Sequence, residues 1–454
     1  MKVVILSQPF DTVTPPIQNS IGIWTYEVAK RLGADCDTTI IARRLRGMPA
    51  RMEIDGMRFE LPRCVPARAW ATASRLWGHV NPRSPLVAQS VYAFDFLAQA
   101  MRTIRRVSPD IVHVQNFPQY VPAVRWAAPN AAILLHMHCD WLGELDRGAM
   151  KRALAATDLA VGCSEHVVAV ARGRFAEMDT AFAVLPNGAP TSHKIGAASR
   201  IPGKVLFVGR VSPEKGLHTL IEAWETVVSA CPEARLDIVG PAATLPREFL
   251  IDLSTDREVR DLSRFYKGGS AYLGSYETAL RAMIPQAIAS TVSFVGTLPY
   301  QVLAERYASA SLVVNPSLSE SFGMSLIESL SNGTPVLATR VGGMTEIVES
   351  TGGGVLVKKN DPEALAAQII DLLGNPAGAA KLGSRGAAQI ADRYGWDKIA
   401  ESTQDLYARA IAIRRPQLGR RNSSFVQRRA LNDVKTEPVS SPHSQLTASP
   451  TRKI

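Results

Sequence analysis

Cysteine is scarce in this sequence. Its five cysteines are scattered along the chain and odd in number: Cys36, Cys64, Cys139, Cys163 and Cys231. A secreted disulfide scaffold needs paired cysteines, and a structural zinc site needs ligands at close spacing. We therefore expect buried free thiols in a reducing, cytoplasmic compartment, and neither a disulfide framework nor a zinc site.

Long hydrophobic runs are also missing. No apolar stretch reaches the roughly 18 residues that a membrane-spanning helix requires, and the apolar part of residues 1–7 is too short for a signal peptide. Hydrophobic residues make up 46% of the 454 positions and charged residues 20%, which is an ordinary globular balance. The composition therefore indicates a globular protein of two or three domains.

Positive charge exceeds negative charge, and the excess is concentrated at the end of the chain. The net charge is +10, and from Arg414 onward nine Lys or Arg residues oppose Asp433 and Glu437. The same segment is rich in Ser, Pro, Gln and Thr, which predicts a disordered basic tail over residues 414–454. Such a tail could contact an anionic membrane surface, which would place the protein at the inner membrane face. No aromatic interleaving or nucleic-acid motif is present, so no nucleic-acid partner is expected.

Apolar runs alternate with helical patterns along most of the chain. Before residue 190, the runs that favour strands are residues 3–7, 38–42, 111–114, 132–138, 159–162 and 183–185. After a polar linker, the corresponding runs are residues 205–209, 235–239, 292–295, 312–314, 336–341 and 354–357. This alternation predicts two open α/β units with parallel sheets covered by helices.

The most informative stretch covers residues 315–346. It follows a predicted strand, and we expect a helix over residues 322–330 that ends at Asn332-Gly333. The backbone N–H groups at the start of this helix have no partner inside it, and such an end binds phosphate well. The residues concerned are Ser321, Phe322, Gly323 and Met324.

Two carboxylates bracket this helix start. Glu320 lies just before the helix and Glu328 inside it, roughly 9 Å further along the axis at about 1.5 Å per residue. One helix could therefore hold a diphosphate at its amide end and ribose hydroxyls at Glu328, with Glu320 facing the group on the far phosphate. The alternative is a capped amphipathic helix with two surface acids, because acids are common near helix N-termini.

Two cations follow the predicted strand at residues 205–209. Arg210 and Lys215 stand five positions apart on a short loop that ends at Gly216. Two fixed cations near one point could stabilise the negative charge that builds on a departing diphosphate. The alternative is ordinary surface charge.

Another group of arginines follows the second strand: Arg43, Arg44, Arg46 and Arg51. This group could contact an anionic acceptor or membrane surface, or it could simply be solvated.

Taken together, these residues resemble the nucleotide-sugar site of retaining glycosyltransferases of the GT-B fold, family four. The resemblance rests on the two glutamates separated by seven residues, on Phe322-Gly323 between them, on residues 332–336 and 342–346 after them, and on the Gly-Arg and Lys-Gly pairs at residues 209–216. It implies two Rossmann-like domains facing a cleft, with a C-terminal helix that crosses back to the first domain.

The resemblance also implies roles for particular residues. Glu320 faces the donor sugar, as does His138 from the end of the strand at 132–138, and Glu328 binds the ribose. The donor diphosphate is contacted by Arg210, Lys215, Phe322, Gly323 and Met324, and the base lies beside Gly296, Thr297 and Leu298. His136 shares a strand face with His138, so a metal site or a buried core histidine are alternatives at that place.

One position departs from the family pattern. Family members usually carry two adjacent glycines against the donor phosphate in the loop after the first strand. Here Asn19-Ser20 stand at that place, with Gly22 nearby. These residues could contact the donor or acceptor, or Asn19 could simply cap the helix that follows.

The resemblance implies the following domain organisation: residues 1–190 form the acceptor-side domain, 191–393 the nucleotide-sugar domain and 394–413 the returning helix. Residues 241–290 exceed what the second unit needs and represent either an acceptor loop or a plain insertion.

The implied activity is transfer of a hexosyl group from a UDP- or GDP-sugar to a glycan, lipid-linked or small-molecule acceptor, as in polysaccharide biosynthesis. No acidic metal-binding cluster is evident, so we expect neither a metal ion nor a cofactor. The alternatives are a nucleotide-sugar epimerase or hydrolase of the same fold, and a non-catalytic nucleotide-sugar-binding protein.

Overall fold

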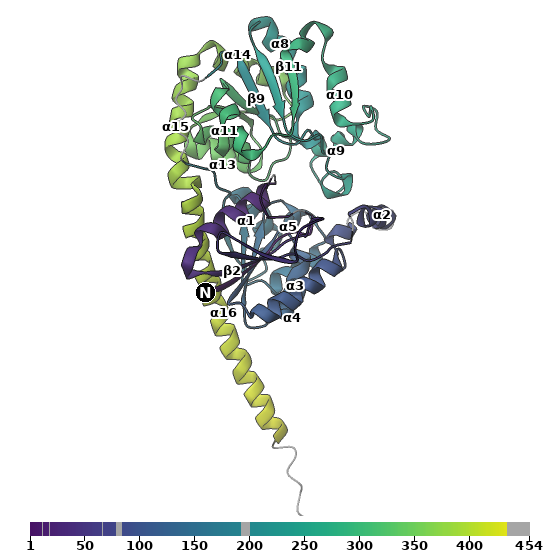
Figure 1. The fold of residues 1–454 in the computed structure, drawn as a ribbon. Helices are drawn as coiled ribbons and strands as arrows, with labels where there is room; N and C mark the ends of the chain where they lie inside the picture. The colour runs from purple at the N-terminus through teal and green to yellow at the C-terminus, as the bar shows by residue number, and fades with distance from the viewer. Residues whose placement is uncertain (11, 18, 66, 79–83, 192–199, 434–454) are drawn as a thin grey trace, which may run out of the picture.

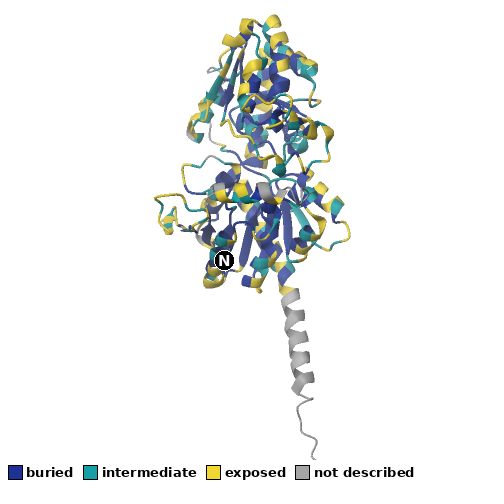
Figure 2. Cartoon of the chain, turned by 90° about the vertical axis from the view of Figure 1, so that its right-hand side faces the viewer, coloured by how far each residue is buried: buried dark blue, intermediate teal, exposed yellow. Residues whose placement is uncertain are grey.

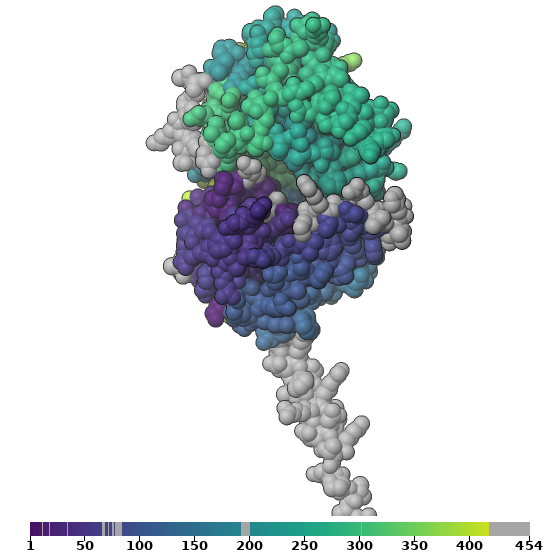
Figure 3. All heavy atoms as spheres, turned by 45° about the vertical axis from the view of Figure 1, so that its right-hand side comes forward, coloured from purple at the N-terminus to yellow at the C-terminus, as the bar shows by residue number. Residues whose placement is uncertain are grey.

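The computed structural model describes residues 1–10, 12–17, 19–65, 67–78, 84–191 and 200–433. The chain forms two lobes, each built on one sheet (Figure 1). Within the described residues, the first sheet has the strand order β3-β4-β2-β1-β5-β6-β7-β8, and the second has the order β11-β10-β9-β12-β13-β14. A groove separates the two lobes in the space-filling view (Figure 3).

The first sheet is parallel except at one edge. Its strands are β1 (Lys2–Leu6), β2 (Asp37–Ile41), β3 (Arg51–Ile54), β4 (Met57–Glu60), β5 (Ile111–Gln115), β6 (Ala132–Met137), β7 (Leu159–Gly162) and β8 (Ala181–Val184). The antiparallel pair β3–β4 turns at Asp55-Gly56, where both residues have positive φ. The sequence analysis missed this hairpin because edge strands exposed on one side contain no continuous apolar run.

The second sheet is parallel throughout. Its strands are β9 (Lys204–Val208), β10 (Arg235–Val239), β11 (Val292–Gly296), β12 (Leu312–Asn315), β13 (Val336–Thr339) and β14 (Gly354–Val357). Strands β12 and β13 are buried along their whole length, as helices on both faces require, and this is why they read as unbroken apolar runs. Figure 2 shows buried strands at the centre of each lobe.

Helices cover both sheets (Figure 1). In the first lobe they are α1 (Ser20–Arg31), α2 (Ala67–Gly78), α3 (Phe94–Val107), α4 (Val121–Ala127), α5 (Trp141–Glu144), α6 (Arg147–Ala155) and α7 (Glu165–Arg174). In the second they are α8 (Leu217–Ala230), α9 (Arg257–Asp261), α10 (Tyr276–Met283), α11 (Tyr300–Ser309), α12 (Met324–Ser331), α13 (Gly342–Thr351), α14 (Pro362–Gly374) and α15 (Pro376–Tyr394).

The last helix, α16 (Trp396–Asp433), returns to the first lobe (Figure 1). The Tyr407 hydroxyl lies 2.9 Å from His113 Nδ1 on β5, and Arg31 Nε of α1 donates to Asp397 at 2.7 Å. The returning helix is thus present, and α16 continues through residues 414–433, where the sequence analysis expected a disordered tail. Residues 434–454 of the predicted tail lie outside the described residues.

Two features of the composition have structural counterparts. All five cysteines are free, and Cys36, Cys163 and Cys231 are buried. Among the helices of the described ranges, none has both the length and the apolar character needed to cross a bilayer.

Candidate active site

The candidate site is built around the start of α12. This helix begins at Met324 rather than at residue 322, because its N-cap Gly323 adopts a left-handed conformation with φ of 107°. A Cβ atom on Gly323 would lie 2.9 Å from Met344 Cγ, so a larger residue fits poorly. Ser321 and Phe322 therefore belong to a loop, and the free amides of the helix start at Met324.

Lys215 and Glu320 form an ion pair at this place. The distance from Lys215 Nζ to Glu320 Oε2 is 2.6 Å, and the two side chains are only 15% and 17% exposed. The loop carrying Lys215 is held against the loop carrying Glu320, because the Leu318 amide donates to Glu214 O at 2.8 Å. The structure thus brings together two residues that the sequence analysis placed in one site from separate motifs.

The loop that carries Glu320 rests on the start of α13. Gly342 has a φ of +50°, and a Cβ atom at this position would lie 1.8 Å from the carbonyl oxygen of Glu320. Only glycine allows this approach without displacing the loop. The motif at residues 342–346 thus fixes the backbone position of Glu320.

Arg210 lies on the same loop as Lys215 and is paired differently. Its Nη2 atom lies 3.2 Å from Glu214 Oε1, and the Arg210 side chain is 40% exposed whereas that of Glu214 is 3% exposed. The Ser212 hydroxyl also donates to Glu214. The buried carboxylate therefore orients Arg210 while leaving the guanidinium reachable from solvent. The sequence analysis missed this role of Glu214.

Glu328 lies on the buried face of α12, and the residue is 8% exposed. The hydroxyl of Tyr307 on α11 donates to its Oε2 atom at 2.7 Å. Burial raises the pKa of Glu328 to about 7, and the neighbouring hydroxyls of Tyr307 and Tyr300 oppose this rise. The Glu328 carboxylate thus already accepts a hydrogen bond from a buried hydroxyl.

The loop predicted to hold the base leads directly into α11. Gly296 and Thr297 are exposed, whereas Leu298 is partly buried. Tyr300, the first residue of α11, is a neighbour of Glu328 and helps to lower the pKa of its carboxyl. The loop at residues 296–298 thus ends two residues before Tyr300, a neighbour of the predicted ribose ligand.

Glu328 makes stability depend on pH. Folding raises its pKa from 4.5 to about 7, so the folded protein binds this proton more tightly, and its free energy of unfolding falls as pH rises between those values. At pH 8 the ionised Glu328 lowers the free energy of unfolding by on the order of 3 kcal/mol.

Glu328→Gln removes this pH-dependent loss. In thermal melts without nucleotide, the Tm of the variant minus the Tm of wild type should therefore be larger at pH 8 than at pH 5. An equal Tm difference at both pH values would contradict this environment for Glu328.

His138 lies at the carboxyl end of β6, in a buried group of rings. Its ring centroid is 4.0 Å from that of His136 and 5.9 Å from that of Trp24. Burial lowers the pKa of His138 to about 3, so it is neutral at pH 7 and can act only through neutral hydrogen bonds. His136 is a core histidine whose Nε2 lies 3.1 Å from Leu185 O. In the described ranges, no three His, Cys, Asp or Glu side chains are grouped so that they could hold a metal ion.

Asn19 caps α1, as one of the two interpretations of Asn19-Ser20 predicted. Its Oδ1 atom accepts the Gly22 amide at 2.7 Å. A Cβ atom on Gly22 would lie 2.7 Å from Ile17 Cγ2, so Gly22 keeps the preceding loop close to the helix. Contact of Asn19, Ser20 or Gly22 with a donor stays a prediction.

Residues of the first lobe close the site from the other side, and the sequence analysis assigned none of them a role. The Ser164 hydroxyl donates to Ser321 O at 2.7 Å, and Asp140 Oδ2 accepts from the Ser321 hydroxyl at 3.3 Å. Glu346 of α13 accepts the amides of Glu165 and His166 at 2.9 and 2.7 Å, so it caps α7 across the groove. The motif containing Glu346 was visible in the sequence, but spacing alone does not identify a partner in another domain.

The segment at residues 241–290 also contacts the first lobe. It contains α9 and α10, and the indole of Trp141 donates to Phe249 O at 3.3 Å. The ring of Phe249 lies 6.1 Å from that of Phe10, which follows β1. This segment therefore forms part of the wall of the groove.

Comparisons with known proteins identify the family to which the chain is similar. A family model described as "Glycosyl transferases group 1" matches residues 191–389, and one described as "Glycosyltransferase Family 4" matches residues 21–193. D-inositol 3-phosphate glycosyltransferase of Streptomyces avermitilis is 33% identical over 210 residues, which is 46% of this chain and 40% of that protein. The enzyme of the same name from Acidothermus cellulolyticus is 35% identical over 223 residues, which is 49% of this chain and 44% of that protein. The matched region thus spans less than half the length of these relatives.

Solved structures match almost the whole chain. Sucrose-phosphate synthase from Thermosynechococcus elongatus has a TM-score of 0.68 at 20% identity, covering 91% of this chain and 100% of that one. HepE of Anabaena in complex with UDP-glucose has a TM-score of 0.61 at 17% identity, covering 90% of this chain and 99% of that one. These likenesses show a GT-B fold, as the resemblance implied. With the two family models matching consecutive parts of residues 21–389, the chain belongs to the family-four glycosyltransferases of group 1.

Proposed function

We propose that this glycosyltransferase transfers a hexosyl group from UDP-hexose to an acceptor, with retention of configuration and without a metal ion. The observation that carries the proposal is the Lys215–Glu320 pair at the start of α12. Both partners are mostly shielded from water, and free helix amides lie beside them. A diphosphate placed there would take Lys215 as a partner and leave Glu320 free for the sugar.

Positive groups replace the metal in this proposal. The diphosphate would be bound by Lys215, Arg210 and the amide end of α12. Negative charge develops on the phosphate oxygen as the glycosidic bond breaks, and preorganised cations stabilise it. A uridine base is preferred over guanosine because HepE, which has the same fold, is known in complex with UDP-glucose. The base would lie at Gly296, Thr297 and Leu298, with the ribose at Glu328.

Retention follows from a displacement on one face of the sugar. The bond from C1 to the leaving phosphate oxygen breaks, and the bond from C1 to the acceptor oxygen forms on the same face. The acceptor proton passes to the leaving phosphate, so no enzyme nucleophile is needed. Neutral His138 cannot supply a charge, and its part would be to hold a sugar hydroxyl. Glu320 would position the sugar ring.

Release of UDP from UDP-glucose in excess chelator tests the proposal. We expect release to depend on the acceptor supplied, to continue without metal, and to fall at least roughly 100-fold in Glu320→Ala, because misplacing a reacting group by about 1 Å can cost that much. Release at the same rate without any acceptor would favour a hydrolase or epimerase. Nucleotide binding without turnover of any donor would favour the non-catalytic alternative. Activity that disappears with chelator and returns with Mn²⁺ would overturn metal independence.

A further inference from the structure

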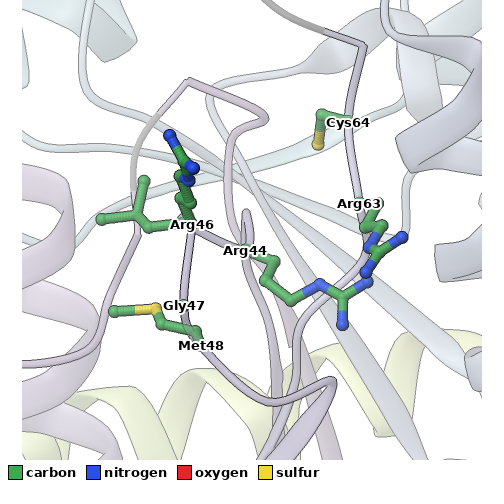
Figure 4. Close-up of a pocket in the computed structure, with 7 residues that line it drawn as sticks. Arg44, Arg46, Gly47, Met48, Arg63 and Cys64 are labelled. Carbon is green, nitrogen blue, oxygen red and sulfur yellow. The ribbon is translucent and has the colours of Figure 1, made fainter.

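A pocket of about 300 Å³ opens on the first lobe beyond the carboxyl end of β2. Three arginines line it, together with Met48 and Cys64 (Figure 4). Arg44 and Arg46 come from the loop after β2, and Arg63 comes from the segment after β4. The side chains of Arg44 and Arg63 point toward one another in Figure 4.

These three cations have no matching negative charge. No carboxylate lines the pocket, and within the part of the chain that the structure describes, no ion pair involves Arg44, Arg46 or Arg63. The arginines of the neighbouring hairpin differ, because Arg51 pairs with Glu60 at 3.2 Å and Arg58 pairs with Asp37. Like charges that face each other repel unless an anion lies between them.

The other groups near the pocket do not supply that anion. Burial and the charge of Asp95 raise the pKa of the Cys64 thiol to about 11, so the thiol is neutral. Asp95 does not line the pocket, and its carboxylate accepts the Val65 amide at 2.5 Å. The pocket therefore presents guanidinium donors that pair with no carboxylate of the described chain. Guanidinium groups match the geometry of phosphate and bind it through paired hydrogen bonds.

The pocket adjoins the groove through the loop that follows β1. Arg43, next to Arg44, donates from Nη1 to Phe10 O at 2.9 Å, and the Thr14 hydroxyl donates to Met48 Sδ at 3.7 Å. Phe10 in turn contacts Phe249 of the second lobe. A molecule that extends from this pocket into the groove would enter it from the first lobe. An acceptor must bind on that side, because the donor is expected on the second lobe.

We propose that the pocket of Arg44, Arg46 and Arg63 binds a phosphate group carried by the acceptor. This inference rests on the proposed function, because it assigns the acceptor of the same reaction. Arg44 and Arg63 hold the phosphate between them, and Arg46 adds a third cation. The phosphate belongs either to a phosphorylated sugar or to a phospholipid headgroup, and both carry the same recognisable chemistry.

The test measures anion binding with the donor site already filled. Wild type and Arg44→Gln/Arg63→Gln are saturated with UDP, so that the donor-site cations are occupied, and are then titrated calorimetrically with glucose 6-phosphate. Sedimentation with phosphatidylcholine vesicles, with and without phosphatidic acid, tests the lipid source. Arg51→Gln is the matched control, since it removes a nearby arginine that already has a carboxylate partner.

Binding to the double variant should be roughly 10- to 100-fold weaker than to wild type and Arg51→Gln, because charge-assisted hydrogen bonds are lost. Weakened binding of glucose 6-phosphate supports a sugar phosphate, and weakened binding of phosphatidic acid vesicles alone supports a headgroup. Equal binding of both probes by the double variant and wild type, or no binding of either probe, overturns the proposal. UDP binding reports separately on the donor site: its retention in the double variant shows that the variant is folded, and its absence in wild type would contradict the proposed function instead.

Discussion

Lys215→Met is expected to lower kcat for hexosyl transfer by roughly 10²- to 10³-fold, the cost of removing one preorganised group that stabilises charge in the transition state. Lys215 lies 2.6 Å from Glu320 and is mostly shielded from solvent. Methionine keeps the length and the apolar stem, so the change removes mainly the charge. Initial rates of UDP release, measured over a range of donor concentrations, separate kcat from KM.

Two further variants make this result interpretable. Lys381→Met removes an exposed lysine of α15 in the same lobe and should leave kcat unchanged. Lys215→Met/Glu320→Gln also removes the charge of the carboxylate that has lost its partner. Comparing it with Lys215→Met shows how much of the loss in kcat comes from leaving Glu320 unpaired. A kcat of Lys215→Met within about threefold of wild type would mean that Lys215 does not stabilise the leaving group.

Gly342→Ala should give the second largest loss, at a residue that is not expected to touch the substrate. The new Cβ atom would lie 1.8 Å from Glu320 O, and the residue has a φ of +50°. The loop bearing Glu320 must therefore move, and a shift of about 1 Å in a reacting geometry can cost roughly 10²-fold in rate. Overpacking of this kind also destabilises by about 1–3 kcal/mol. Rates of UDP release and thermal melts measure both effects.

Gly374→Ala provides the control for this substitution. Gly374 ends α14, and a Cβ atom there meets nothing within 4 Å. We expect activity and Tm close to those of wild type. If Gly342→Ala behaved like Gly374→Ala, the loop would tolerate the added methyl group, and α13 would not set the position of Glu320.

The sequence predicted the parts of the molecule that follow from local pattern. Buried parallel strands read as apolar runs, so the strands of both sheets other than β3 and β4 were found. The N-cap role of Asn19 was one of two stated alternatives. The motifs that carry Glu320, Glu328, Arg210 and Lys215 were visible, and the structure places Lys215 against Glu320.

The features that the sequence did not predict depend on contacts between segments that are distant in the chain. The β3–β4 hairpin has alternating exposure and therefore no apolar run. Besides its N-cap Ser164, the start of α7 donates to Glu346, about 180 positions further along the chain than His166. No spacing rule predicts such a partner. Helix α16 extends past residue 413, where Arg414 donates to Pro129 O of the first lobe. Composition alone favours disorder there, since it takes no account of an existing helix.

Titration of UDP into the protein in excess chelator tests the proposed donor site most directly, by isothermal calorimetry on wild type and Glu328→Ala. The site as described predicts that UDP binds wild type without metal, that GDP binds more weakly, and that Glu328→Ala loses at least about tenfold in affinity, because a hydrogen bond to a charged group contributes roughly 1.5–3 kcal/mol. No UDP binding by wild type under these conditions, or equal binding by Glu328→Ala, would contradict the assignment of this groove as a nucleotide-sugar site.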